Sequence, residues 1–316
     1  MKFIRDINHI VKKELYYQWH SRKILIPLLS LIVLCAIHLL GLYNDIVSAY
    51  NLYRRTESIF IAEGIDIVEA LREPSYVYFD GSSRVIGNLL NYDFTTLAIS
   101  IQNLSPRNII GNFLEFSVFV FCTLIFGIYA CFVASYEYKL KTYKLLSVQY
   151  FQEYIIIGKL ISAVIVMILT LIFALFIILL GSYIVTPLVA TQIGINDFVI
   201  DIFNYQRSLA IQILFSFFVI FFYIVLGFCL SFILKNILPP AIFMFVFGLI
   251  IPILWSYDFR NIFVYFSHDI FSFTARFSMI QPIPINETAG ILLIILILAA
   301  LLTTTLVVAR NRSAYD

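Results

Sequence analysis

Few residues in this chain could carry out catalysis, and their spacing excludes the common catalytic motifs. Gly158-Lys159 is the nearest approach to the phosphate-binding loop GxxxxGK[ST], but Glu153 stands where the first glycine should be. The sequence contains no HExxH, CxxC or GxSxG pattern. Its four histidines are far apart: His9, His20, His38 and His268. We therefore expect no ATP site, metal site or catalytic residue in the chain, and no cofactor of its own.

Five polar residues remain candidates for a function. His268-Asp269, with Arg276 nearby, is a histidine–carboxylate pair that could act as an acid and a base at a water-facing surface. His38 and Glu115 fall inside stretches long enough to cross a membrane, where an ionisable side chain is a functional candidate. The ordinary interpretation of each is a structural hydrogen bond. The apolar stretches lack the deeply placed carboxylates of a proton or ion relay, which disfavours transport driven by an ion gradient.

The composition predicts an all-α integral membrane protein. Hydrophobic residues make up 61% of the 316 residues and charged residues only 13%, about half of what a soluble protein carries. A membrane-spanning helix needs about 20 mostly apolar residues. Six stretches meet this requirement and are numbered here as spans one to six: 24–43, 109–135, 155–186, 208–234, 237–257 and 288–309.

The lysines predict the orientation of these spans. If six spans alternate, all nine lysines fall on one side, which then carries 13 basic and 5 acidic residues. The other side carries 8 arginines and 14 acidic residues. Because basic residues concentrate in cytoplasmic loops, the lysine-rich side is expected to be cytoplasmic. We expect a multi-pass protein of a bacterial cytoplasmic membrane with both termini in the cytoplasm.

The first 23 residues are expected to form an amphipathic helix on the inner membrane surface. Apolar residues recur at helical spacing between basic ones, as in interfacial helices. This apolar stripe consists of Ile4, Ile7, Val11, Leu15 and Trp19.

The remaining segments outside the spans are expected to be small. Residues 44–108 form an external segment with a helix over Ile46–Leu71 and a turn at 80–83. Residues 258–287 are aromatic and partly charged, which favours short external helices at the membrane interface. Residues 310–316 form a short cytoplasmic tail.

The charged segment 136–154 joins spans two and three on the cytoplasmic side. Neither glycine nor proline interrupts it, so a helix is allowed throughout. Lys139, Lys141 and Lys144 cluster there between apolar residues. The segment could be a rigid helix that transmits a push to both spans, or a solvated basic link that only follows the charge rule. The residues alone leave both interpretations open.

The whole chain resembles the membrane subunits of type-2 ABC transporters, the ABC-2 permease superfamily. The similar features are the interfacial N-terminal helix, six spans, the external segment after span one and the short external helices after span five. An acid that ends span two (Glu137), a turn with Thr142 and a lysine that opens span three (Lys159) match the family's pattern. Lys141 and Gln149 depart from it, because glycine and proline are common at these positions.

The resemblance implies that 136–154 contains a coupling helix, centred on 141–147, that sits in a cleft of a separate ATP-binding subunit. The expected contact residues are Glu137, Lys139, Lys141, Thr142, Lys144 and Leu145. Two membrane subunits, identical or related, would meet through spans two and five around the cargo path. The residues expected to line this path are Phe119, Thr123, Phe126, Phe243, Phe247 and Ile251. ATP and Mg²⁺ would bind to two copies of the partner subunit.

The expected function is therefore that of a transport subunit in an ATP-driven exporter, and not of an enzyme. Because the expected path carries no charge, its cargo should be an amphipathic peptide or a lipid. Membrane lipid is an expected partner and nucleic acid is not. Two alternatives stay open: a sensor or structural subunit that moves no cargo, and an outer-face enzyme that uses His268, Asp269 and Arg276. Co-purification with an ATPase, and activity of a His268→Ala variant, would discriminate among the three.

Overall fold

The computed structural model describes residues 2–80, 83–140, 143–198, 208–273 and 277–311, and most of them are helical. Within these ranges, five helices are long and apolar enough to cross a membrane. They are α2 (Leu25–Ala62), the continuous helix Ile109–Tyr138, α8 (Gln152–Gln192), α9 (Leu209–Leu234) and α12 (Glu287–Asn311). A multi-pass, largely helical membrane protein is confirmed at this level.

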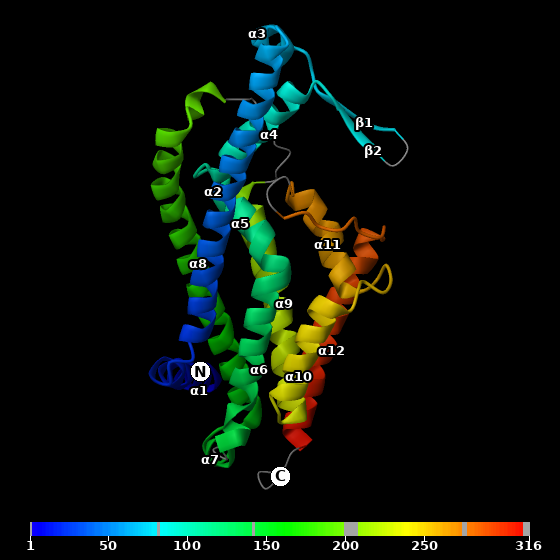
Figure 1. The fold of residues 1–316 in the computed structure, drawn as a ribbon. Helices are drawn as coiled ribbons and strands as arrows, with labels where there is room; N and C mark the ends of the chain where they lie inside the picture. Colours follow the sequence, from blue (N-terminus) through cyan, green and yellow to red (C-terminus); the bar gives the residue numbers. More distant parts are fainter. Residues whose placement is uncertain (1, 81–82, 141–142, 199–207, 274–276, 312–316) are drawn as a thin grey trace.

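The helix Ile109–Tyr138 lies against α9 along the middle of the bundle (Figure 1). It begins as α5 (Ile109–Ser117), passes through a π-helical turn, η1 (Val118–Cys122), and continues as α6 (Thr123–Leu140). A Cβ atom added to Gly227 on α9 would collide with the backbone carbonyl oxygen of Gly127 on α6. The two backbones therefore touch at this crossing, as small residues allow between membrane helices.

Helices α2 and α8 are much longer than a bilayer is thick. With 38 and 41 residues they measure about 57 and 62 Å, against about 30 Å of hydrocarbon. The expected break after residue 43 does not occur, because α2 continues without interruption through the polar residues 44 and 45. Both helices therefore extend well beyond the membrane at the end of the bundle opposite α1 (Lys2–His20) (Figure 1).

The external segment packs on the extended part of α2. Here α3 (Ile67–Arg72) is capped by Asp66, whose side chain accepts a hydrogen bond from the Val68 N–H. Helix α4 (Leu89–Leu104) lies along α2, where the buried Thr56 hydroxyl donates to Asp93 at 2.6 Å. A short 3₁₀ turn, η2 (Ile195–Asp197), follows α8.

An antiparallel hairpin in this segment was not expected from the sequence. Strands β1 (Tyr76–Asp80) and β2 (Ser83–Gly87) pair from Tyr76 opposite Gly87 to Asp80 opposite Ser83. The Tyr76 ring covers Gly87, where a Cβ atom would collide with it. The hairpin projects sideways from the bundle (Figure 1). The sequence predicted only a turn at 80–83, of which residues 81 and 82 lie outside the described residues.

Span five is shorter than expected. Helix α10 (Leu238–Phe245) continues into a π-helical turn, η3 (Val246–Ile250), and the backbone then leaves the helix. These 13 residues extend about 20 Å, less than the hydrocarbon thickness. The chain continues through an irregular stretch into α11 (Phe259–Ile270), so a sixth full-length spanning helix is not present among the described residues.

Arg260 stabilises this break in the helix. Its guanidinium donates to the carbonyl oxygens of Phe247, Ile251 and Pro252 at 2.5 to 2.9 Å. Its remaining N–H groups donate to the Asp258 carboxylate. Carbonyl oxygens that leave a helix need protein donors where water is excluded, and this one side chain supplies donors to three of them.

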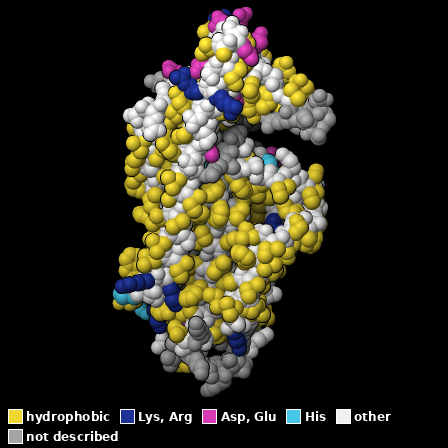
Figure 2. Space-filling model, in the orientation of Figure 1, with side chains coloured by type: hydrophobic (Ala, Val, Ile, Leu, Met, Phe, Trp, Pro, Cys, Tyr) yellow, Lys and Arg dark blue, Asp and Glu magenta, His cyan; other side chains and the backbone are white. Residues whose placement is uncertain are grey.

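The ends of the bundle differ in charge. Acidic side chains gather around the end that carries α3, and hydrophobic side chains cover most of the middle of the face that Figure 2 draws. Helix α1, helix α7 (Tyr143–Gln149) and the end of α12 lie together at the opposite end (Figure 1). An apolar middle with charged ends is the surface of a protein that crosses a membrane.

Candidate functional site

A buried ion pair joins α6 and α8 where the chain turns between them. The Glu137 carboxylate lies 2.7 Å from the Lys159 ammonium nitrogen, and both side chains are almost completely buried. The ammonium also donates to the Val133 carbonyl oxygen at 3.3 Å and lies 4.3 Å from the centre of the Tyr136 ring. Separating the two groups would leave buried charges without compensation, which is costly. The pair therefore fixes the two helices to one another at this level.

Helix α1 adds polar side chains to the same cluster. Glu14 accepts a hydrogen bond from the Tyr136 hydroxyl at 2.7 Å. One helical turn later, the Gln18 amide accepts from Tyr129 at 2.6 Å and donates to Ser162 at 3.0 Å. Helix α1 thus contacts α6 and α8 together through buried polar groups, in addition to its apolar contacts.

The Glu14 carboxyl is a weaker acid than usual. Burial raises its pKa above the ordinary value of 4.5; the Lys159 ammonium opposes the shift and the Glu137 carboxylate adds to it. Two carboxyl groups therefore share the field of one ammonium group. When Glu14 holds its proton, the three groups together carry no net charge.

The interfacial face of α1 differs from the expected stripe. Val11 is buried, together with Ile10, Glu14 and Gln18, on the face that packs against α8 and α6. Ile4 and Trp19 are exposed on the rest of the helix. Apolar residues of α1 therefore lie on two faces: one packs against the protein and the other is available to lipid. The stripe expected from the sequence combined residues from both faces.

The tip between α6 and α8 carries exposed apolar side chains. Helix α7 begins at Tyr143 and ends at Gln149, and α8 begins at Gln152. Val148 is 82% exposed and Phe151 is 70% exposed, while Leu146 is buried beneath them. Exposed apolar residues at a short helix tip outside the apolar middle of the molecule are typical of a protein contact surface. Sequence reasoning named neither residue, although both stand out as apolar positions in a polar link.

Of the expected coupling residues, the structure shows the side chain of only one, Glu137. Glu137 is only 3% exposed and its carboxylate is paired with Lys159 inside the chain, so it does not face outward as expected. Lys141 and Thr142 lie outside the described residues, as do the side chains of Lys139, Lys144 and Leu145. The expected helix over 136–154 is divided: α6 continues to Leu140 and a separate α7 follows.

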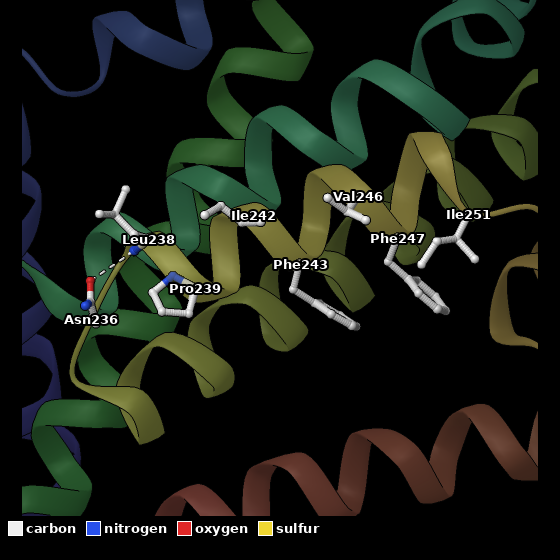
Figure 3. Close-up of a pocket in the computed structure, with 8 residues that line it drawn as sticks. All are labelled: Asn236, Leu238, Pro239, Ile242, Phe243, Val246, Phe247 and Ile251. Atoms are coloured by element: carbon white, nitrogen blue, oxygen red, sulfur yellow. Dashed lines mark hydrogen bonds between the residues drawn. The ribbon is translucent and has the colours of Figure 1, made fainter.

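The three span-five path residues line an apolar groove. Phe243, Phe247 and Ile251 lie along one side of α10 and η3, and Phe243 and Phe247 stack with their ring centres 5.2 Å apart (Figure 3). The groove has a volume of about 630 Å³. Its other lining residues are Asn236, Leu238, Pro239, Ile242 and Val246. No described segment of the chain covers this face fully, because Phe243 and Ile242 are exposed.

Two of the three span-two path residues lie inside the chain, and the third, Phe119, is half-buried. Thr123 and Phe126 are buried, and the Thr123 hydroxyl is bonded to the carbonyl oxygens of its own helix. The Phe119 ring packs against Phe271 and Phe273 from the segment after α11. That segment partly covers the Phe119 ring, and Thr123 and Phe126 are buried, so these three residues do not form an open path surface in this conformation.

The other candidate residues have structural partners. A ring nitrogen of His268 lies 3.2 Å from the Ile280 carbonyl oxygen. Neighbouring residues on a helix do not face each other, so His268 and Asp269 diverge, and Arg276 lies outside the described residues. Glu115 accepts hydrogen bonds from the backbone N–H groups of Ser272 and Phe273.

His38 is buried against two aromatic rings, those of Phe113 and Phe116. Within the described ranges, no three His, Cys, Asp or Glu side chains come together in a way that could hold a metal ion. The buried cluster around Lys159 and the exposed tip at Val148 are therefore the features from which a function can be argued.

Comparisons of the chain with protein-family models, with curated proteins and with solved structures gave no match.

Proposed function

We propose that this chain is the membrane subunit of an ATP-driven exporter of the type-2 ABC class. In this proposal a separate ATP-binding subunit docks on α7, and the end of the bundle with α1 and α7 is cytoplasmic. The observation that carries the proposal is the α7 tip: its base is fixed by the buried Glu137–Lys159 pair, and its end presents the exposed Val148. A short helix on a rigid base can pass a displacement to two long helices at once.

Six crossings are part of the proposal. Helix α10, η3 and the irregular stretch held by Arg260 would together form the fifth crossing. The N-terminal helix and the end of α12 lie at the same end of the bundle (Figure 1), which favours an even number of crossings. Lysines concentrate at that end by sequence position, which favours a cytoplasmic assignment.

The cargo path in this proposal runs between two membrane subunits that face each other through the α10 groove. Phe243, Phe247 and Ile251 would line it, and Thr123 and Phe126 would contribute only after a rearrangement that opens the span-two face. The groove has no charged lining residue, so the cargo would be an amphipathic peptide or a lipid.

The test is purification of this chain from its native membrane together with any ATP-binding subunit that accompanies it, followed by reconstitution of the complex. We expect the two proteins to co-purify, the complex to hydrolyse ATP, and a Val148→Asp variant to lose the partner because a buried charge at the contact is costly. The matched control is Val68→Asp, an exposed valine on α3 at the other end of the molecule. Retention of the partner by the Val148 variant would refute docking at α7. A complex that hydrolyses ATP but moves no peptide or lipid in vesicles would favour the sensor interpretation.

A further inference from the structure

A second cavity lies at the α1 and α7 end, between α1, α6 and the turn that joins α9 to α10. It has a volume of about 630 Å³, within the range of small-molecule and cofactor sites. Two lysines line it among aromatic and small polar residues, and no carboxylate of the described residues does. The lining residues are Tyr17, Lys23, Phe132, Ser135, Tyr136, Tyr138, Leu140, Lys235, Asn236 and Ile237. The cavity therefore has the charge and chemistry of an anion site.

Lys23 is held in this cavity by three aromatic rings. Its ammonium nitrogen lies 4.3 to 4.5 Å from the ring centres of Tyr17, Phe132 and Tyr136. It also donates to the Tyr17 hydroxyl at 2.9 Å. Among the described residues, no carboxylate forms an ion pair with it. A half-buried cation with aromatic neighbours and no anionic partner is available to a bound anion.

Lys235 enters the cavity from a strained turn. Its φ of 53° is in the left-handed region, which glycine and asparagine adopt more readily than lysine. The turn is fixed to α6, because the Ser231 hydroxyl donates to the carbonyl oxygens of Cys131 and Asn236. Lys235 is the residue that ends α9, and the fixed turn holds its backbone at the edge of the cavity.

The basic cavity adjoins the apolar groove on α10. Asn236 lines both, and Leu238 and Ile242 continue the groove from there along α10 (Figure 3). An anion held between Lys23 and Lys235 could therefore carry a hydrocarbon chain that lies in the groove. Because the Lys23 ammonium already fills the aromatic cage, a ligand with its own quaternary ammonium group, such as choline, would meet like charge there.

We propose that this cavity binds the phosphate headgroup of an anionic phospholipid whose acyl chain follows the α10 groove. Basic pockets between helices at the cytoplasmic membrane surface bind phosphate headgroups in this way. The proposal rests on the cytoplasmic orientation given above, but it requires neither an ATP-binding subunit nor transport.

The test is native mass spectrometry of the full chain purified in detergent, titrated with dioleoyl phosphatidylglycerol and dioleoyl phosphatidylcholine. We expect preferential binding of phosphatidylglycerol. A Lys23→Gln/Lys235→Gln variant should bind it about thirtyfold more weakly, because each lysine near an anionic surface contributes on the order of a factor of five. Lys235→Gln alone, which leaves the aromatic cage intact, should lose about fivefold. The control is Lys12→Gln/Lys13→Gln, which removes two exposed lysines of α1 outside the cavity.

Three results would overturn the proposal. Equal binding of the two lipids, or an equal loss in the Lys12→Gln/Lys13→Gln control, would mean that no specific headgroup site exists. Inorganic phosphate that binds as tightly as phosphatidylglycerol would assign the cavity to a free anion. Unchanged binding of phosphatidylglycerol by the Lys23→Gln/Lys235→Gln variant would mean that the two lysines do not hold the headgroup. Because the isolated chain is used, failure of the transporter proposal would leave this test intact.

Discussion

The Glu137 carboxylate lies 2.7 Å from the Lys159 ammonium nitrogen, in a pair that is almost completely buried between α6 and α8. Removal of one member leaves a buried charge without compensation, whereas replacement of both can be nearly neutral. We expect Lys159→Met to cost about 3–5 kcal/mol of stability, and Glu137→Gln/Lys159→Met to recover most of it. Thermal unfolding in detergent measures this. Lys12→Met, at an exposed lysine of α1, is the control, and a double variant as unstable as the single would argue against the pair.

Glu14 should make the stability of the protein depend on pH. Its pKa in the folded chain is raised above 4.5, mainly by burial, so the folded state keeps a proton that the unfolded state has lost. The contribution of Glu14 is therefore fully present below pH 4.5 and declines by about 1.4 kcal/mol per pH unit as the pH rises towards the raised pKa.

Glu14→Gln should remove this decline, so that the variant gains stability over the native chain between pH 5 and pH 8. Melting temperatures across this range of pH measure the effect. Glu63→Gln, at an exposed carboxyl beyond α2, should leave the slope unchanged. Parallel pH profiles for Glu14→Gln and the native chain would contradict the burial of an ionisable Glu14.

Arg260 should not be replaceable by lysine, even though the charge is kept. Its fork of donors serves three carbonyl oxygens and the Asp258 carboxylate, and an ammonium group lacks this planar geometry. Arg260→Lys should cost on the order of 3 kcal/mol, because buried acceptors lose their donors. The exposed Arg107→Lys is the control. Equal melting temperatures for the two variants would show that interactions other than those of Arg260 stabilise the irregular backbone after Ile250.

The crossing of α6 and α9 should not tolerate a methyl group at Gly227. A Cβ atom there would collide with the Gly127 carbonyl oxygen, and the backbone cannot turn aside as a side chain can. Gly227→Ala should cost about 1–3 kcal/mol. At Gly248 the nearest atom is a side-chain methyl of Leu124 at 3.3 Å, so Gly248→Ala should be close to neutral. Thermal unfolding of both variants compares a backbone collision with a side-chain contact, and equal tolerance would contradict close packing at Gly227.

Hydropathy correctly predicted helices whose ends coincide with the ends of an apolar stretch of sequence. The expected span 208–234 and α9 (Leu209–Leu234) agree almost residue for residue. The same reasoning overestimated the length of span five. The helix ends after Ile250, where Arg260 donates hydrogen bonds to carbonyl oxygens that no longer have helical partners. Arg260 follows the apolar stretch in the sequence, so an average of hydropathy over that stretch does not reveal its interaction with the helix. The sequence also predicted a separate helix over Ile46–Leu71, whereas α2 runs unbroken from Leu25 to Ala62 and α3 follows at Ile67.

The candidate site was only partly visible in the sequence for the same reason. Lys159 was expected at the membrane interface, but its pairing with Glu137 and its nearness to Glu14 arise from packing of three helices. The path residues of span two were inferred from a helical face, but Thr123 and Phe126 are buried and the segment around Phe273 packs on Phe119. The sequence shows Val148 as an apolar residue in a charged link. It does not show which apolar residue of α7 is buried; in the structure this is Leu146, and Val148 is exposed.

The most direct test of the central claim is a photo-cross-link from the tip of α7. A photoreactive phenylalanine analogue at position 148, introduced into the chain in its native membrane, should form a covalent adduct with an ATP-binding subunit that mass spectrometry identifies. The same analogue at Val68, an exposed valine of α3, should not form it. The account predicts the adduct from position 148 only. Absence of an ATP-binding protein among the adducts from position 148, or its equal capture from position 68, would contradict the account.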